Sequence, residues 1–288
     1  MKVAWFAPPL LHSQAERLGL LDTGDLDFIG VANRSSDEQF KFLQSGTVDA
    51  VVSAMDNVIM WNRRPDGGDL RIIAEIEGKT GLSLVSSAGI GAIADLKGKR
   101  LLVDSAENGF VIALRALLAD AGVEFDGCTI IPAGGVVARL EGMVADEGDA
   151  TLLGIPFTEM AEAKGLRRLA DVETAYPAFP GQGIIARQPI IAEKADELKA
   201  WLSALEQSRA WCRSHPAELV AILTGQGTPE PIAQRLAGFV GDSLVPSMVS
   251  IELLIGQRQM LGLPGGDATA EALVELALVA GIDGACRV

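Results

Sequence analysis

Short apolar strands alternate with amphipathic helices along most of this 288-residue chain, and this alternation restricts the possible folds more than any other feature. Strand patterns are expected at 2–7, 26–33, 49–55, 70–76, 81–87, 99–105, 128–134, 149–156 and 166–172. Most of them are followed by a stretch with apolar residues at helical spacing, such as 110–122. Strands of this length alternating with helices predict an α/β fold with largely parallel sheets covered by helices.

The last part of the chain is expected to be helical, with helices at 217–225, 229–238, 245–262 and 268–281. No polar or low-complexity linker divides the chain, so two lobes would have to be joined by segments that cross between them. The glycine-rich stretches 82–98 and 179–189 are the expected crossings, because glycine permits the backbone changes of a hinge. We therefore predict lobe I from residues 1–84 plus 188–288, with the C-terminal helices, and lobe II from residues 85–187.

The charge balance restricts the possible partners. Lys and Arg total 24 against 38 Asp and Glu, which gives a formal net charge of −14. This argues against nucleic acid or an anionic membrane surface as the partner. A small anion remains compatible, because backbone dipoles bind one locally. The apolar runs have the length of strands, so no membrane-inserted helix is expected.

The sequence contains few residues that hold metals or form disulfides. Its three cysteines, Cys128, Cys212 and Cys286, are far apart and are expected to be reduced thiols. Two histidines, His12 and His215, exclude a histidine-rich metal site. Nucleophile-elbow, zinc-protease, Walker and strand-linked dinucleotide motifs are missing. We expect no metal and no cofactor.

The N-terminal sequence MKVAWFAPPL continues directly into a strand pattern. It has no apolar segment ending in small residues of the kind found in secretory signals. This predicts a cytoplasmic location, or a periplasmic one if an upstream signal was removed.

The candidate site lies at the carboxyl ends of the strands, where open parallel sheets bind ligands. Small residues there leave backbone N–H groups accessible to a carboxylate, sulfonate or similar oxyanion. The alternative interpretation is ordinary turns whose polar residues cap helices. The candidate ligand-binding residues are Phe6, Ala7, Pro8, His12, Ser53, Met55, Asp56, Asn57, Trp61, Ser86, Ser87, Ser105, Asn108, Gly109, Phe110, Gly134, Gly135, Gly154 and Pro156.

The turn VDSAENGF, at 103–110, is the most specific of these positions. Its N–H groups from about Asn108 to Phe110 are expected to face an anion, with the Ser105 hydroxyl beside them. Glu107 adds a negative charge to the same turn. Apolar walls are expected from Phe6, Met55 and Trp61.

Two segments resemble a known family. AIADLKGKRLLVDSAENGFVIALRALLADAGV and FLQSGTVDAVVSAMDN are similar to the solute-binding proteins of nitrate, sulfonate and taurine transporters, with their thiamin pyrimidine synthase relatives. The resemblance covers roughly residues 1–240. It implies a type II periplasmic-binding-protein fold, in which two Rossmann-like lobes close on a ligand. It also implies ligand contacts from Phe6 to Pro8, Met55 to Asn57 and Ser105 to Phe110. The Cys-rich motif and His pair of the pyrimidine synthases are not present.

Two hypotheses for the function remain open. The first is a binding protein for an organic anion or small aromatic acid, which would serve an ABC transporter permease or a cytoplasmic sensing role. The second is a cytoplasmic enzyme of the same fold that acts on a small acid as a decarboxylase, isomerase or hydrolase. In that case His12, Asp56 and Glu107 are the candidate acid/base groups.

Overall fold

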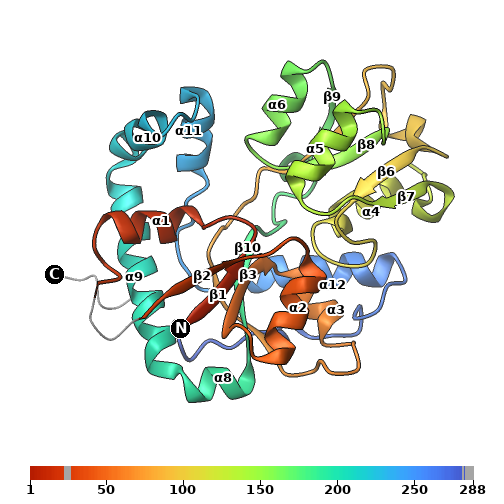
Figure 1. Cartoon of the computed structure of the whole chain (residues 1–288). Coiled ribbons are helices and arrows are strands. Elements are labelled where there is room, and N and C mark those ends of the chain that lie inside the picture. The colour runs from red at the N-terminus through yellow and green to blue at the C-terminus, as the bar shows by residue number, and fades with distance from the viewer. Residues whose placement is uncertain (23–26, 281, 283–288) are drawn as a thin grey trace.

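The chain forms two α/β lobes, each built on a five-stranded sheet (Figure 1). The computed structural model describes residues 1–22, 27–280 and 282. The strand order is β2-β1-β3-β10-β4 in the first sheet and β7-β6-β8-β5-β9 in the second. The strands are β1 (Lys2–Trp5), β2 (Ile29–Ala32), β3 (Ala50–Ala54), β4 (Leu70–Glu75), β5 (Ser83–Ser86), β6 (Arg100–Val103), β7 (Thr129–Pro132), β8 (Ala150–Leu153), β9 (Arg167–Asp171) and β10 (Gln182–Arg187).

Helices follow most of the strands, as the alternating pattern predicts. They are α1 (Leu10–Arg17), α2 (Ser36–Ser45), α3 (Asp56–Trp61), α4 (Val111–Asp120), α5 (Val136–Val144), α6 (Phe157–Ala163), α7 (Val172–Ala175), α8 (Gln188–Glu193), α9 (Ala195–Ser214), α10 (Pro216–Gly225), α11 (Glu230–Gly238), α12 (Met248–Met260) and α13 (Ala270–Leu273). Two short 3-10 helices, η1 (Ile93–Leu96) and η2 (Phe125–Gly127), lie in the second lobe. No helix among the described residues is both long and apolar enough to span a bilayer.

Each sheet contains one strand that runs against the others. In the first sheet, β10 is antiparallel to both β3 and β4, while β1 is parallel to β2 and β3. In the second sheet, β5 is antiparallel to β8 and β9, while β6 is parallel to β7 and β8. The antiparallel strand of each sheet adjoins a crossing segment, so its direction follows from the route of the chain between the lobes.

The same aspartate contact sets the start of the central strands in both lobes. Asp49 Oδ2 accepts a hydrogen bond from the Lys2 amide at 2.7 Å, and Asp149 Oδ2 accepts one from the Arg100 amide at 2.7 Å. Both aspartates immediately precede a buried strand, β3 or β8. The aspartate in the segment FLQSGTVDAVV therefore ties one strand to its parallel neighbour.

The chain crosses between the lobes at 76–82 and at 172–181. The amides of Ile76 and Glu77 both donate to the Gln182 carbonyl, at 2.9 and 3.1 Å, so the crossings lie side by side. A Cβ on Gly181 would lie 2.3 Å from the Glu77 carbonyl oxygen, and this approach requires glycine.

The predicted lobe boundaries differ from these crossings. The first crossing precedes 82–98, and β5 lies entirely in the second sheet, whereas the predicted boundary divides it after residue 84. The second crossing ends at 181, so β10 belongs to the first sheet rather than to lobe II. The boundaries were misplaced because the glycine-rich stretches mark only where a strand begins or ends. The residue pattern does not show which of the two sheets the strand joins.

Three further expectations differ from the structure or fall outside it. The predicted helix 268–281 is helical only in α13, because Val274 instead forms a bridge beside Ile72 of β4. Residue 281, Leu26 of the second predicted strand and Cys286 lie outside the described residues. Cys128 and Cys212 are both free thiols.

The core covers both faces of the first sheet and continues onto the second sheet. On one face, Val3 and Val52 pack against Leu11 of α1 and Trp201 of α9. The other face packs against α2, α3 and α12 (Figure 1). Helix α12 also contacts α4 of the second lobe, so its position depends on both lobes.

We predict that Glu75 makes stability depend on pH. Glu75 lies at the end of β4 beside the first crossing, accepts the Ser247 amide at 3.0 Å, and has a pKa that burial raises from 4.5 to about 7. The folded protein thus binds this proton more tightly than the unfolded chain. Its contribution is present below pH 4.5 and is lost as pH rises towards 7. Glu75→Gln should raise the free energy of unfolding at pH 8 by about 3 kcal/mol relative to wild type. The two proteins should differ little at pH 4.5.

Urea unfolding at the two pH values measures this difference. The matched control is Glu271→Gln, a substitution at an exposed glutamate, which should follow wild type at both values. Equal pH dependence in wild type and Glu75→Gln would contradict the prediction.

Candidate functional site

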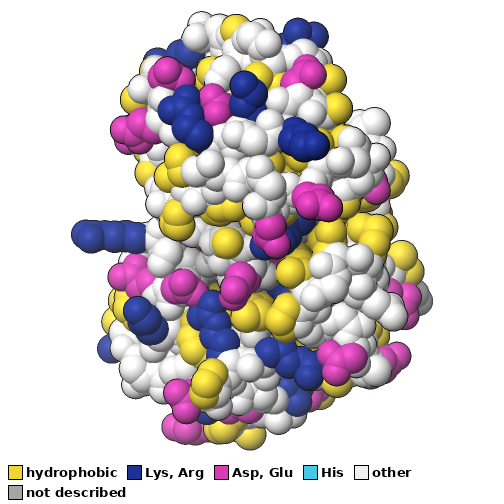
Figure 2. Space-filling view, turned by 90° about the vertical axis from the view of Figure 1, so that its right-hand side faces the viewer, with side chains coloured by type: hydrophobic (Ala, Val, Ile, Leu, Met, Phe, Trp, Pro, Cys, Tyr) yellow, Lys and Arg dark blue, Asp and Glu magenta, His cyan; other side chains and the backbone are white. Residues whose placement is uncertain are grey.

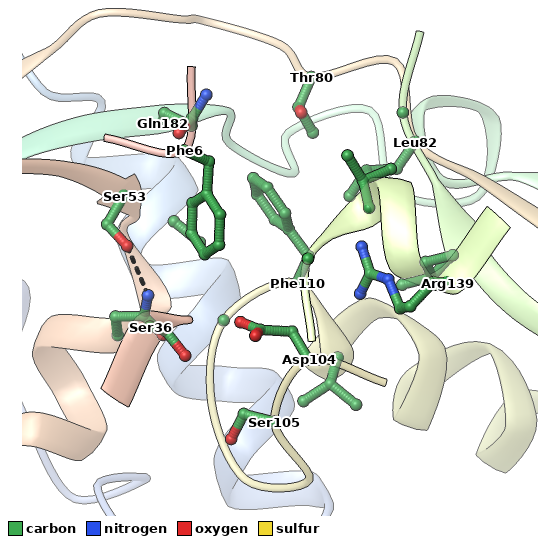
Figure 3. A pocket seen from close by; sticks show the side chains of 18 of the residues that line it. Phe6, Ser36, Ser53, Thr80, Leu82, Asp104, Ser105, Phe110, Arg139 and Gln182 are labelled. Carbon is green, nitrogen blue, oxygen red and sulfur yellow. Dashed lines mark hydrogen bonds between the residues drawn. The ribbon is translucent and has the colours of Figure 1, made fainter. Parts of the chain in front are cut away.

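A cavity of about 290 Å³ lies between the two lobes (Figure 3). The first lobe contributes the turn after β1, the first turn of α2 and the end of β3. The second lobe contributes the turn after β6, the first turn of α5 and the turn after β8. Glu77, Thr80 and Gln182 close the side next to the crossings. The carboxyl ends of strands from both lobes and the two crossing segments therefore surround the same cavity.

Many of the predicted ligand-binding residues line this cavity. They share positions just beyond the carboxyl ends of parallel strands or in the turns that follow. These residues are Phe6, Ala7, Pro8, Ser53, Asn57, Ser105, Asn108, Gly109, Phe110, Gly135 and Gly154.

The walls of the cavity are largely apolar. Phe6 from the first lobe and Phe110 from the second direct their rings into it (Figure 3). Phe6 is 40% exposed, and Phe110 is held from behind by Phe179, with ring centroids 6.4 Å apart. Leu82 and Phe157 complete the wall on the second lobe. Rings on two lobes favour a ligand with a flat or apolar body.

His12 does not line the cavity, contrary to prediction. It is 1% exposed and packs among Trp5, Phe28 and Trp201, whose Nε1 donates to His12 Nδ1 at 3.3 Å. Burial lowers its pKa, and the neighbouring Glu16 opposes that shift. His12 is therefore a core residue between α1 and α9, because its helix turns that face towards the aromatic cluster.

Met55 and Trp61 are also core residues rather than cavity walls. Both are at most 1% exposed and belong to the apolar cluster of the first sheet. Trp61 packs against Phe40, with ring centroids 5.9 Å apart. Met55 was a candidate because it directly follows β3 and Trp61 as a ring on the next helix, but both side chains pack into the core instead.

Four other predicted residues lie outside the lining. Ser86 ends β5 and Ser87 follows it, and the antiparallel direction of β5 places its carboxyl end at the opposite edge of the sheet. Gly134 and Pro156 are also excluded, although their neighbours Gly135 and Ile155 line the cavity.

Asp56 forms a buried ion pair instead of facing a ligand. Arg258 Nε donates to Asp56 Oδ1 at 2.6 Å, and Arg258 Nη2 donates to Oδ2 at 2.5 Å. Both residues are at most 1% exposed. Burial raises the pKa of Asp56, and the hydrogen bonds from Arg258 and Gly109 oppose that shift. Arg258 lies 202 positions away, and no local signal in the sequence points to it.

This ion pair holds the turn of the second lobe that carries the candidate site. Arg258 Nη2 donates to the Glu107 carbonyl at 2.9 Å, and the Gly109 amide donates to Asp56 Oδ2 at 2.9 Å. Gly109 has φ +80, a conformation that favours glycine. The Gly109 N–H group predicted to face an anion is thus occupied by Asp56. Glu107 is exposed and does not line the cavity, so none of the three proposed acid/base groups lines it.

A chain of amide and hydroxyl side chains continues this contact. Asn108 Nδ2 donates to Asn57 Oδ1, Asn57 Nδ2 donates to Ser53 Oγ, and the Ser105 hydroxyl donates to Asn108 Oδ1, each at 2.6 Å. Gln39 in turn accepts the Ser53 hydroxyl at 2.6 Å. Asn57 and Asn108 therefore border the cavity and join the lobes.

The polar residues of the lining that sequence reasoning missed are Ser36, Glu77, Thr80, Asp104, Arg139 and Gln182. Asp104 directly follows β6, and Arg139 lies in the first turns of α5, just after β7. Both positions satisfy the rule used for the other candidates, so charged residues shortly after a strand were the available signal. Ser36 begins α2 shortly after β2, so the same rule also applied to it, whereas the crossing residues reach the cavity only through the path of the chain between the lobes.

Asp104 and Arg139 are the charged groups of the second lobe that line the cavity. Burial lowers the pKa of the Arg139 guanidinium, and the charge of Asp104 opposes that shift. Burial raises the pKa of Asp104, against the charge of Arg139 and hydrogen bonding from Ser36. Arg139 Nε and Asp104 Oδ1 are buried and have no hydrogen-bond partner among the described residues. Two groups of this kind at one cavity make it the candidate binding site of the described residues.

Glu77 is the third charged group at the cavity. Burial raises its pKa, and hydrogen bonding from Gln182 opposes that shift. The outer surface seen in Figure 2 carries acidic and basic side chains interspersed rather than one continuous patch.

Comparison with known proteins agrees with this architecture. A family model described as NMT1/THI5 like matches residues 15–219. A relative from Brucella abortus (strain 2308), whose name describes it only as a binding protein, is 25% identical over 162 residues. That match covers 55% of this chain, and the chain spans about half the length of the curated relatives it matches, 50% in this case.

Two solved structures share the fold. The alkanesulfonate-binding protein SsuA from Xanthomonas axonopodis pv. citri, bound to MOPS, has a TM-score of 0.72 and 16% identity, over 98% of this chain and 96% of that one. The periplasmic nitrate-binding protein NrtA from Synechocystis PCC 6803 has a TM-score of 0.76 and 15% identity, over 94% of this chain and 84% of that one. The two lobes, two crossings and intervening cavity are those of a periplasmic-binding-protein fold.

The family can be stated as well, because its model matches well over half of the chain. The chain belongs to the NMT1/THI5-like family.

We predict that Arg258→Met destabilises the protein by about 3–5 kcal/mol, because it leaves Asp56 buried and charged without its partner. The double variant Asp56→Asn/Arg258→Met should recover part of that loss, since it buries no lone charge. Urea unfolding at pH 7 measures both effects. A single variant as stable as wild type, or a double variant less stable than Arg258→Met, would contradict this role of the pair.

Proposed function

We propose that this chain is the solute-binding protein of an ABC-type importer and closes its two lobes on a small organic anion, such as a small aromatic acid. The observation that carries the proposal is the Arg139 guanidinium at the cavity wall. Its Nε is buried and has no hydrogen-bond partner among the described residues.

An unpaired guanidinium at a cavity wall favours an acidic ligand. Arginine presents several N–H donors in a planar fork that matches a carboxylate or sulfonate. No ion pair within 4.0 Å joins Arg139 to a carboxylate in the described part of the chain. An acid group bound there would satisfy donors whose burial is otherwise unfavourable.

The apolar walls support an organic rather than an inorganic anion. Phe6, Phe110 and Phe157 surround a volume that accommodates more than a single oxyanion. The two proteins of like fold bind an alkanesulfonate and nitrate by name, and both ligands are anions. This likeness supports an anionic ligand but does not choose among anions.

The proposed partner is the permease of an ABC transporter. A periplasmic location is part of the proposal, in preference to the cytoplasmic alternative, and the description of NrtA as periplasmic supports it. Closure of the lobes would present a surface made from both of them to the permease.

We predict that Arg139→Gln weakens the binding of benzoate and ethanesulfonate about 10- to 100-fold, because it removes the charge-assisted hydrogen bonds to the acid group. Isothermal titration calorimetry at pH 7.5 measures the affinities. The control is Arg63→Gln, which removes a surface arginine paired with Asp267 and should leave them unchanged.

Equal affinities in wild type and Arg139→Gln would contradict the proposal. Failure of wild type to bind either anion at millimolar concentration would contradict it as well.

A further inference from the structure

We propose that the ligand is amphoteric: it carries an amino group next to its acid group, and Asp104 accepts a hydrogen bond from that amino group while Arg139 binds the acid. This inference rests on the proposed function and names the chemical class of the ligand more narrowly. The observation behind it is that the cavity contains an unsatisfied acceptor as well as an unsatisfied donor.

Asp104 provides the acceptor. It follows β6 directly and lines the cavity below Phe110, where Figure 3 shows its carboxylate entering the cavity. Its Oδ1 is buried and has no hydrogen-bond partner among the described residues. Most buried polar atoms in folded proteins have a partner, so this atom at the cavity wall is available to a donor from outside the chain.

Asp104 and Arg139 do not satisfy each other. Each influences the pKa of the other, so they lie within electrostatic reach. Yet no ion pair within 4.0 Å joins them. A bound group that contacts both must therefore present a donor and an acid side by side. An α-amino acid or an ortho-amino aromatic acid has this arrangement.

The charges near Asp104 favour the same class. Asp37 lies close enough for its charge to raise the pKa of Asp104, whereas the hydroxyl and amide of Ser36 act in the opposite sense. An acid without an amino group would bring another negative charge to this region. A ligand with an ammonium beside its carboxylate brings no net charge, and each of its charged groups faces the opposite one.

The remaining walls accommodate the ligand body. Phe6 and Phe110 lie on the two lobes above the charged pair, so a side chain or ring attached next to the amino-acid group would lie between them. The cavity thus has a charged end that would bind the amino and acid groups and an apolar end that would contact the rest of the ligand.

Matched pairs of acids with and without the amino group test this inference. The probes are L-alanine and propionate, L-leucine and 4-methylpentanoate, L-phenylalanine and 3-phenylpropanoate, and 2-aminobenzoate and benzoate. Affinities are measured by isothermal titration calorimetry for wild type, Asp104→Asn, Arg139→Gln and the control Asp126→Asn, which changes an exposed aspartate of the same lobe. Circular dichroism and urea unfolding establish that each variant is folded.

The inference predicts that at least one amino acid binds wild type at least tenfold more tightly than its partner acid. Asp104→Asn should abolish that difference with little loss of affinity for the partner acid, and Arg139→Gln should weaken both. If the acids without amino groups bind as tightly as their partners, the inference is wrong while the proposed function stands. If no acid of either kind binds, both are wrong.

Discussion

The arrangement of the site depends on one buried ion pair, between Asp56 at the start of α3 and Arg258 on α12. Both residues belong to the first lobe, yet each also bonds to the backbone of the turn after β6 in the second lobe. The pair fixes where that turn lies, and the turn carries Ser105, Asn108 and Phe110 to the cavity. One of the contacts that join the lobes therefore also shapes the wall of the site.

This contact is suited to lobes that separate and close. Asp56 and Arg258 would remain paired in an open form, because both lie in the first lobe. Their bonds to Gly109 and Glu107 and the Asn57–Asn108 bond would be lost, together with other contacts between the lobes such as Arg235–Glu159. Hydrogen bonds of this kind contribute about 1 kcal/mol each, so a few of them favour closure without making it permanent. Contacts of a ligand with Phe6 on one side and Arg139 on the other would add to the same closed form.

The local pattern predicted much of the fold, but not the direction or partners of every strand. Alternating strands and helices follow from residue spacing, whereas the aspartates before β3 and β8 bond to strand starts 47 and 49 residues earlier in the chain. The sheet to which β10 belongs depends on the crossing geometry at Gly181, which is set by segments about 100 residues apart.

In the site, Phe6 and Ser105 were found because strand ends meet at one edge. His12 and Trp61 were wrongly assigned to the cavity. Each lies on a helix that follows a strand, and the sequence does not show that its side chain faces the core. Arg258 required the tertiary structure.

The central claim is that an acid group is held by Arg139 between the two lobes. A crystal structure with the tightest-binding acid of the matched pairs tests it most directly. The account predicts the acid group within hydrogen-bond distance of the Arg139 guanidinium, the ligand in contact with Phe6 of one lobe and Phe110 of the other, and the Asp56–Gly109 contact intact. An acid bound to one lobe alone, or bound with Arg139 turned away from it, would contradict the account.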